Sequence, residues 1–217
     1  MDLTKLNLAE MSRWSHGLES DTAEVRADRR RFATARTSMG NGHVEEQLIR
    51  LMVWVGAVTV STTVHSRVYH PLDILRDGTA WCDQQVRIFS FFALHLAHVN
   101  CREYSIYHTD GANGHSVAEA YYHGGWHLYD LHSDHQNVYR GPGGEILSYE
   151  DICKSPQVVE AEGHWWRGND GVGKIGFYTS ERPPMIMLPL ASYRAEKHHY
   201  INPQWDGSLY AGEDLVG

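Results

Sequence analysis

The sequence predicts a mixed fold in which amphipathic helices come first and an antiparallel β-hairpin follows them. Apolar side chains recur at steps of three and four along 44–55 and again along 82–96, which is the spacing of a helix with one buried face. Two strand-like runs, at 115–122 and 126–132, are separated by a short segment that contains two glycines. At 217 residues the chain is long enough for one core and too short for two ordinary domains, so we expect a single domain.

The first 42 residues are expected to form a polar, helical N-terminal extension. Ser20 and Asp21 can cap a helix over TAEVRADRRRFATAR, whose basic run at 29–31 we interpret as a solvated face. The glycines of MGNGH at 39–43 break this helix, and an amphipathic helix follows from Val44. Part of VTVSTTVHSRVYHP is expected to be extended because it is rich in β-branched residues, and Pro71 ends that segment.

The helix that begins at Cys82 is the clearest element. Its apolar positions form one continuous stripe of Cys82, Val86, Phe89, Ala93 and Leu96. Gly78 supplies a flexible approach, and Asp83 occupies the first turn, where an acidic side chain is favoured.

After this helix, REYSIYHT alternates as a strand does, DGANG makes a turn, and the hairpin follows. YRGPGGE is expected to be a loop and LSYEDICK a short helix. The catalytic core is therefore predicted over 43–152. Residues 153–217 are expected to form an aromatic and proline-rich extension of loops and short strands, and Trp165, Trp166 and Trp205 within it could supply a lid.

Composition indicates a globular protein without a nucleic-acid or membrane partner. The net charge of -8 argues against a binding surface built on basic patches. The longest apolar run, LIRLMVWVGAVTV, is about 13 residues, short of the ~20 that cross a bilayer. Three cysteines do not form a disulfide framework, and residues 1–20 show no signal peptide pattern. We therefore expect a cytoplasmic protein, although a leader outside this sequence would place it elsewhere.

The histidines at 123, 127, 132 and 135 suggest a metal site as an alternative. Structural zinc sites usually add cysteine ligands or a compact repeated spacing, and neither is present. We therefore interpret these histidines as polar residues of a hairpin near a site, and we expect no metal and no cofactor.

Cys82, His115 and Asp130 have the residue types and settings that nucleophilic thiol chemistry requires. A helix N-terminus stabilises a thiolate through its unpaired N–H groups and its dipole, and the same groups can hold an oxyanion. An imidazole acts as base, and a carboxylate orients it. Each residue alone would more often be structural, but their joint placement favours a site. Cys101 and Cys153 lack such settings, and we interpret both as structural.

Strand parity decides whether His115 and Asp130 can meet. A two-residue turn at Gly124 and Gly125 would place Glu119 opposite Asp130. A four-residue loop over 122–125 would place Val117 opposite Asp130 and bring His115 to a diagonal position within reach. A three-residue loop without a bulge would put the two side chains on opposite faces.

The span from about 70 to 152 resembles the transglutaminase-like superfamily, a branch of the papain-like thiol enzymes. GTAWCDQQVRIFSFFALHL resembles the nucleophile helix of that family, HVNCREY its arginine-bearing strand, with Arg102 in the place of the arginine, and GHSVAEAYYHGGWHLYDLH its His-x-x-x-Glu strand, Gly-Trp turn and terminal Asp. The resemblance implies an α+β fold in which the nucleophile helix packs on an antiparallel sheet. It also implies Cys82 as nucleophile, His115 as general base and acid, and Asp130 as the orienting carboxylate.

Two departures from the family pattern stand beside these matches. Bulky Trp81 precedes the cysteine where a small residue is common, and Leu131 follows Asp130 where a proline is common. The oxyanion residue of the family has no secure match, which leaves Trp54 and Trp81 as candidates.

The leading hypothesis is a cysteine hydrolase, a peptidase or amidase, that acts on a peptide, protein or small amide or ester through a thioester. An acyltransferase that passes the acyl group to an amine is the first alternative, because water exclusion decides between the two. A family member that binds a peptide or glycan without catalysis is the second. The sequence leaves the substrate and the oligomeric state open.

Overall fold

A computed structural model describes residues 23–61, 70–109, 111, 113–131, 136–161 and 174–187 of the chain. Before the first strand, the described residues form four helices: α2 (Ala23–Met39), α3 (Val44–Val58), α4 (Pro71–Asp77) and α5 (Cys82–Ala97). The break predicted at 39–43 is present between α2 and α3, and α3 extends three residues beyond the predicted 55.

The strands form one sheet of four, β1 (Asn100–Tyr107), β2 (Gly114–Tyr122), β3 (Gly125–Tyr129) and β4 (Met185–Met187). Their order is β3-β2-β1-β4, and every neighbouring pair is antiparallel. The predicted hairpin is therefore present as β2 and β3. The edge strand β4 comes from far along the chain, so the sheet is closed by a segment that the sequence assigned only to loops and short strands.

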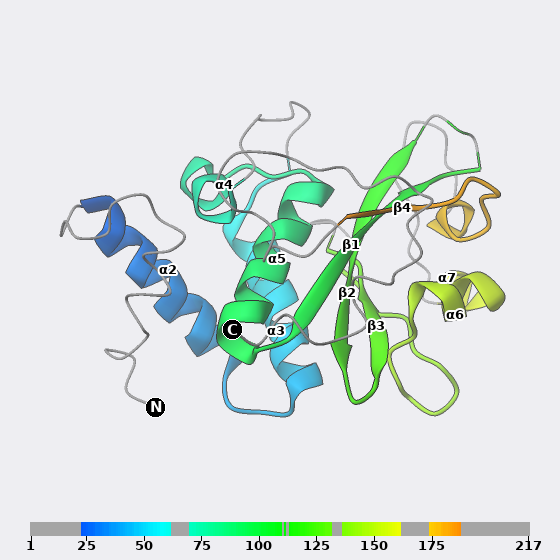
Figure 1. Cartoon of the computed structure of the whole chain (residues 1–217), viewed down its shortest axis with the longest axis horizontal. Coiled ribbons are helices and arrows are strands. Elements are labelled where there is room, and N and C mark those ends of the chain that lie inside the picture. Colours follow the sequence, from blue (N-terminus) through cyan, green and yellow to red (C-terminus); the bar gives the residue numbers. More distant parts are fainter. Residues whose placement is uncertain are drawn as a thin grey trace.

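Helices lie on both faces of the sheet (Figure 1). An apolar cluster of buried side chains lies on each side. The first face of the sheet packs on the helices and includes Ala118, Ala120 and Tyr129. Its second face, with Tyr104 and Val117, packs on three short helices: α6 (Tyr149–Lys154), α7 (Gln157–Ala161) and the 3₁₀ helix η2 (Lys174–Phe177). The fold is therefore of the α+β class, with the helix that begins at Cys82 packed on an antiparallel sheet, as predicted.

Helix α5 lies at the centre of the molecule and is more deeply buried than its sequence predicts. The predicted stripe is present, but the residues between its members are buried as well, from Gln84 to Ala93. The cause is its surroundings, since α2, α3 and α4 contact it from one side and β1 and β2 from the other. A helix enclosed in this way is apolar around most of its circumference.

Helix α4 differs from the sequence-based prediction, in which Pro71 ends an extended segment. Pro71 begins the helix instead, which is a position where its missing N–H costs nothing. Gly78 ends it in a left-handed conformation with φ of 76°, and its N–H donates to the Ile74 carbonyl. Gly78 is thus a helix C-cap, as glycine often is, and not only a flexible approach to Cys82.

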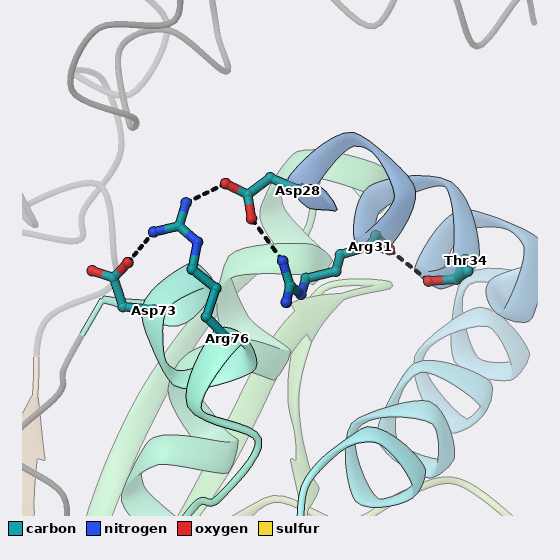
Figure 2. Close-up of polar contacts among 5 residues, drawn as sticks. All are labelled: Asp28, Arg31, Thr34, Asp73 and Arg76. Atoms are coloured by element: carbon teal, nitrogen blue, oxygen red, sulfur yellow. Dashed lines mark hydrogen bonds and ion pairs between the residues drawn. The ribbon is translucent and has the colours of Figure 1, made fainter. Parts of the chain in front are cut away.

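Both predicted extensions contribute to the folded core. Phe32, Ala35 and Met39 of α2 are buried among the helices. Figure 2 shows the polar contact that fixes α2 to α4, in which the buried Asp28 accepts from Arg31 at 3.0 Å and also from Arg76. On the other side of the molecule, 174–187 supplies η2 and β4.

Within the ranges given above, no helix has both the length and the apolar character needed to span a membrane.

Candidate active site

The turn of the hairpin sets the positions of His115 and Asp130. Tyr122 pairs with Gly125, so the turn consists of His123 and Gly124, with φ of 52° and 82°. Two positive φ values are typical of a type I′ turn, which matches the twist of paired strands. Continuing this register places Val117 opposite Asp130. The predicted pairing that brings His115 to a diagonal position is therefore confirmed, although a two-residue turn and not a four-residue loop produces it.

His115 and Asp130 form a buried hydrogen bond. Nε2 of His115 lies 2.8 Å from Oδ1 of Asp130, and the two residues are 3% and 0% exposed. The hydroxyl of Tyr139 donates to Oδ2 of Asp130 at 3.5 Å. The backbone of Asp130 exchanges two hydrogen bonds with Asn137, which fixes the carboxylate at the end of β3. Since Asp130 occupies Nε2, Nδ1 is the ring nitrogen that remains for another partner.

Cys82 is the first residue of α5 and is half-buried. The N-cap is Trp81, whose N–H donates to Oε1 of the buried Gln84 at 3.0 Å. Gln84, the third residue of the helix, thus caps the backbone at the N-terminus. This is one half of a capping box. The side chain of Cys82 lies near the His115 ring, since it is among the neighbours that raise the pKa of that ring. Of the three residues predicted for the site, His115 and Asp130 are in direct contact, and Cys82 lies near the ring.

The pKa of His115 reports on these contacts. Burial lowers this pKa, whereas the charge and hydrogen bond of Asp130, followed by those of Cys82, raise it to about 9. The negative carboxylate of Asp130 favours the imidazolium because it stabilises the positive ring. At neutral pH the His115 ring is therefore mainly the positively charged imidazolium, with a proton on both nitrogens.

Phe177 covers the His115 ring, and sequence reasoning missed it. The two ring centroids are 5.4 Å apart, and Phe177 is 1% exposed. The N–H of Thr109 donates to the Gly176 carbonyl at 3.1 Å, and β4 pairs with β1, so η2 is fixed from both ends. No local pattern signals this contact, because it joins segments that are far apart in the sequence.

Glu119 and Arg102, which also match the family pattern, form an ion pair away from the imidazole. Nη2 and Nε of Arg102 lie 2.7 and 2.8 Å from Oε2 of Glu119, which is fully buried. The N–H of Tyr149 donates to Oε1 of Glu119 at 2.6 Å, and the guanidinium lies over Trp126 at 4.0 Å. This arrangement joins β1 and β2 to the start of α6, so its role is structural.

The other two cysteines differ from Cys82 in position. Cys101 is buried on β1, and burial raises the pKa of its thiol far above the usual range. Cys153 is exposed on α6, and partial burial is the largest cause that raises the pKa of its thiol. All three cysteines are free. Cys153 is therefore a natural reference for an exposed thiol.

The two oxyanion candidates lie in different places. Trp81 directly precedes Cys82 and is 37% exposed. Trp54 is 8% exposed, and its ring lies 5.1 Å from that of Phe92. Because Phe92 is ten residues beyond Cys82, Trp54 packs roughly 15 Å along α5 from the thiol. Trp54 therefore plays no part in the function proposed here.

The histidine group and the tail tryptophans are covered only in part. His123 is in the hairpin turn, and both ring nitrogens of His127 lie near carbonyl oxygens, at 2.7 Å from Ile146 and 3.2 Å from Tyr122. His132, His135, Trp165, Trp166 and Trp205 lie outside the described residues. Among the side chains that are described, no group of three or more His, Cys, Asp or Glu is placed to hold a metal ion.

No family model and no curated protein matches the chain by sequence. Solved structures do show similarity. Calcium-bound LapG of Legionella pneumophila has 13% identity and a TM-score of 0.45, over 70% of this chain and 78% of that one. A protein of Cytophaga hutchinsonii described as a candidate cysteine protease has 12% identity and a TM-score of 0.39, over 56% and 46%. A TGase has 15% identity and a TM-score of 0.36, over 57% and 37%. At such identities, the roles of side chains in this chain must be argued from its own geometry.

Proposed function

We propose that this protein is a thiol enzyme in which Cys82 attacks an amide or ester carbonyl. The observation that carries the proposal is the buried His115, whose ring interacts with Cys82 and hydrogen-bonds to Asp130. In the first step the Cys82 sulfur forms a bond to the carbonyl carbon, and the bond to the leaving amine or alcohol breaks. The leaving group takes a proton from Nδ1 of His115, which leaves a thioester on Cys82 and a neutral imidazole.

The second step reverses these proton movements. The neutral ring accepts a proton from water while the oxygen bonds to the thioester carbon and the sulfur leaves as a thiolate. This makes the protein a hydrolase of the peptidase or amidase kind, which is our leading proposal. An amine in place of water would make it an acyltransferase, so the exclusion of water from the thioester decides between the two.

The oxyanion hole belongs, in this proposal, at the start of α5. The first N–H groups of a helix have no partner within the helix, and the positive end of its dipole lies beside them. The nucleophile Cys82 is the first residue of that helix. When its sulfur attacks a substrate carbonyl, the oxygen of that carbonyl would therefore lie near the same N–H groups. We further propose that the helices, the sheet and residues 174–187 act as one catalytic unit within a single-domain chain.

Alkylation by iodoacetamide tests the proposal, with peptide mass spectrometry to follow each cysteine separately. We expect Cys82 to react near neutral pH at least about tenfold faster than the exposed Cys153, since thiolates and not thiols react. Cys101 is expected to react only after unfolding, because it is buried. The variant His115→Ala should lower the alkylation rate of Cys82 and leave that of Cys153 unchanged.

Equal rates at Cys82 and Cys153, or a rate at Cys82 that does not depend on His115, would contradict an activated nucleophile. The second of our alternatives, a binding protein without catalysis, would then be favoured.

A further inference from the structure

A buried cationic side chain, that of Arg87, lies five residues after Cys82 on α5. The guanidinium of Arg87 is 5% exposed, with Nη2 at 3.5 Å from Oδ2 of Asp83 and Nε at 3.7 Å from Oε2 of Glu103. The Glu103 side chain is only 6% exposed. A guanidinium buried in this way loses its hydration, and apolar side chains in its place are often at least as stable. The cost indicates that this group serves the site as well as the fold.

The positions of the three residues join the two halves of the site. Asp83 follows Cys82 directly, and Arg87 lies one turn later on α5. Glu103 is on β1, opposite Ala118 of β2, the strand that also carries His115. The first turn of the helix is thus connected through Arg87 to the sheet that fixes the imidazole.

We propose that Glu103 is a positioning residue for the nucleophile: through Arg87 it holds the first turn of α5 on the sheet, so that the Cys82 sulfur stays beside the His115 ring. This inference rests on the function proposed above. Glu103 touches neither the substrate nor the reacting atoms, and it acts only through the helix that carries Cys82.

The charge state of Glu103 provides a way to test this role. Burial and the charge of Asp83 raise the pKa of Glu103, Arg87 and a hydrogen bond with Ser116 lower it, and the net result is a pKa of about 8. These are the charged and polar groups that face Glu103 from α5 and β2. At pH 6.5 the side chain is therefore mainly the neutral acid, for which glutamine is a close mimic in shape and charge.

The first measurement is the rate of Cys82 alkylation in Glu103→Ala and Glu103→Gln at pH 6.5. We expect the alanine variant to be about tenfold slower, as misplaced reacting groups are, and the glutamine variant to match the unaltered protein. In a His115→Ala background, Glu103→Ala should cause no further loss, because the position of Cys82 relative to the imidazole no longer matters. Glu46→Ala, on the exposed surface of α3, is the control and should leave the rate unchanged.

The second measurement is the ratio of rates between Glu103→Gln and the unaltered protein from pH 6 to 10. Above pH 8 the ratio should rise to about twofold or more, since an ionised Glu103 competes with Asp83 for Arg87 and adds a negative charge near the thiolate. This test needs only the isosteric variant, so it decides the question even if Glu103→Ala fails to fold.

A flat ratio, or an effect of Glu103→Ala that is equally large without His115, would overturn the positioning role. Those results would leave the proposed function intact if Cys82 still reacts faster than Cys153 in a way that depends on His115. Loss of that dependence in the unaltered protein would instead contradict the function itself.

Discussion

At the scale of single residues, Asp130 controls the charge of the site. It is fully buried, accepts from His115 and Tyr139, and is the largest of the influences that raise the His115 pKa. Burial acts in the opposite direction, so the proton on the imidazole depends on the negative neighbours.

The variant Asp130→Asn should therefore lower the His115 pKa from about 9 to near or below the ordinary value of 6.5. An NMR titration of the imidazole Cε1–H signals, with His115→Gln to assign the resonance, measures it. The Cε1–H chemical shift of His127, whose ring contacts the carbonyl oxygens of Ile146 and Tyr122, should not change with this substitution. A His115 pKa that stays near 9 would show that Asp130 does not hold the proton.

Arg102 contributes to stability and not to the chemistry of the site. Its loss would leave the buried Glu119 carboxylate without its cation. We expect Arg102→Leu to lower the free energy of unfolding by about 3 kcal/mol, as removal of one partner of a buried ion pair does. Urea unfolding followed by circular dichroism measures the change. Adding Glu119→Gln should recover part of the loss, and no recovery would mean that the guanidinium stabilises through its packing on Trp126 instead.

At the scale of elements, the hairpin turn sets the register on which the site depends. Gly124 has φ of 82°, which favours glycine, whereas Gly125 does not have a positive φ and a Cβ there would meet only ordinary contacts near His127. Gly124→Ala should thus lower the free energy of unfolding by about 1 kcal/mol, and Gly125→Ala, the matched control, by much less. Thermal unfolding of both variants measures the difference, and equal losses would contradict the turn assignment.

The sequence could narrow the register of the hairpin to a few possibilities, but it could not choose among them or identify the turn. His115 and Asp130 share a face of the sheet for any turn with an even number of residues, but not for a three-residue turn without a bulge. The glycine pair suggested a turn at 124 and 125, yet His123 takes the left-handed conformation instead. Helix α4 was within reach of sequence reasoning, because Pro71 at its start and Gly78 at its end are ordinary helix signals.

At the scale of the whole molecule, contacts between distant segments complete the site. Residues 174–187 add β4 to the sheet and place Phe177 over His115, and α2 is tied to α4 by Asp28. No local sequence pattern indicates these contacts, because each depends on how separate elements pack. The residue types predict that Cys82 and His115 lie close together. They do not predict that Phe177 lies over the His115 ring.

Two buried groups predict how the stability of the molecule depends on pH. Both His115 and Glu103 have a pKa that is raised in the folded state, so each favours folding most when protonated. The contribution of Glu103 is lost between about pH 4.5 and 8, and that of His115 between about pH 6.5 and 9. The free energy of unfolding should therefore fall from pH 6 to pH 9.

Urea titrations at several pH values measure this slope. In the double variant His115→Gln and Glu103→Gln the fall over this window should be much smaller. A fall of the same size in that variant would assign the pH dependence to other groups.

The central claim is that Cys82 forms a thioester with the acyl group of its substrate, and trapping that thioester tests it most directly. The protein is mixed with p-nitrophenyl acetate, quenched in acid within seconds and digested for peptide mass spectrometry. The account predicts an acetyl group on Cys82 that hydroxylamine removes, that forms more slowly in His115→Ala and that is absent in Cys82→Ala. Acetylation confined to Cys153 or to lysines, with p-nitrophenol released equally fast by Cys82→Ala, would contradict it.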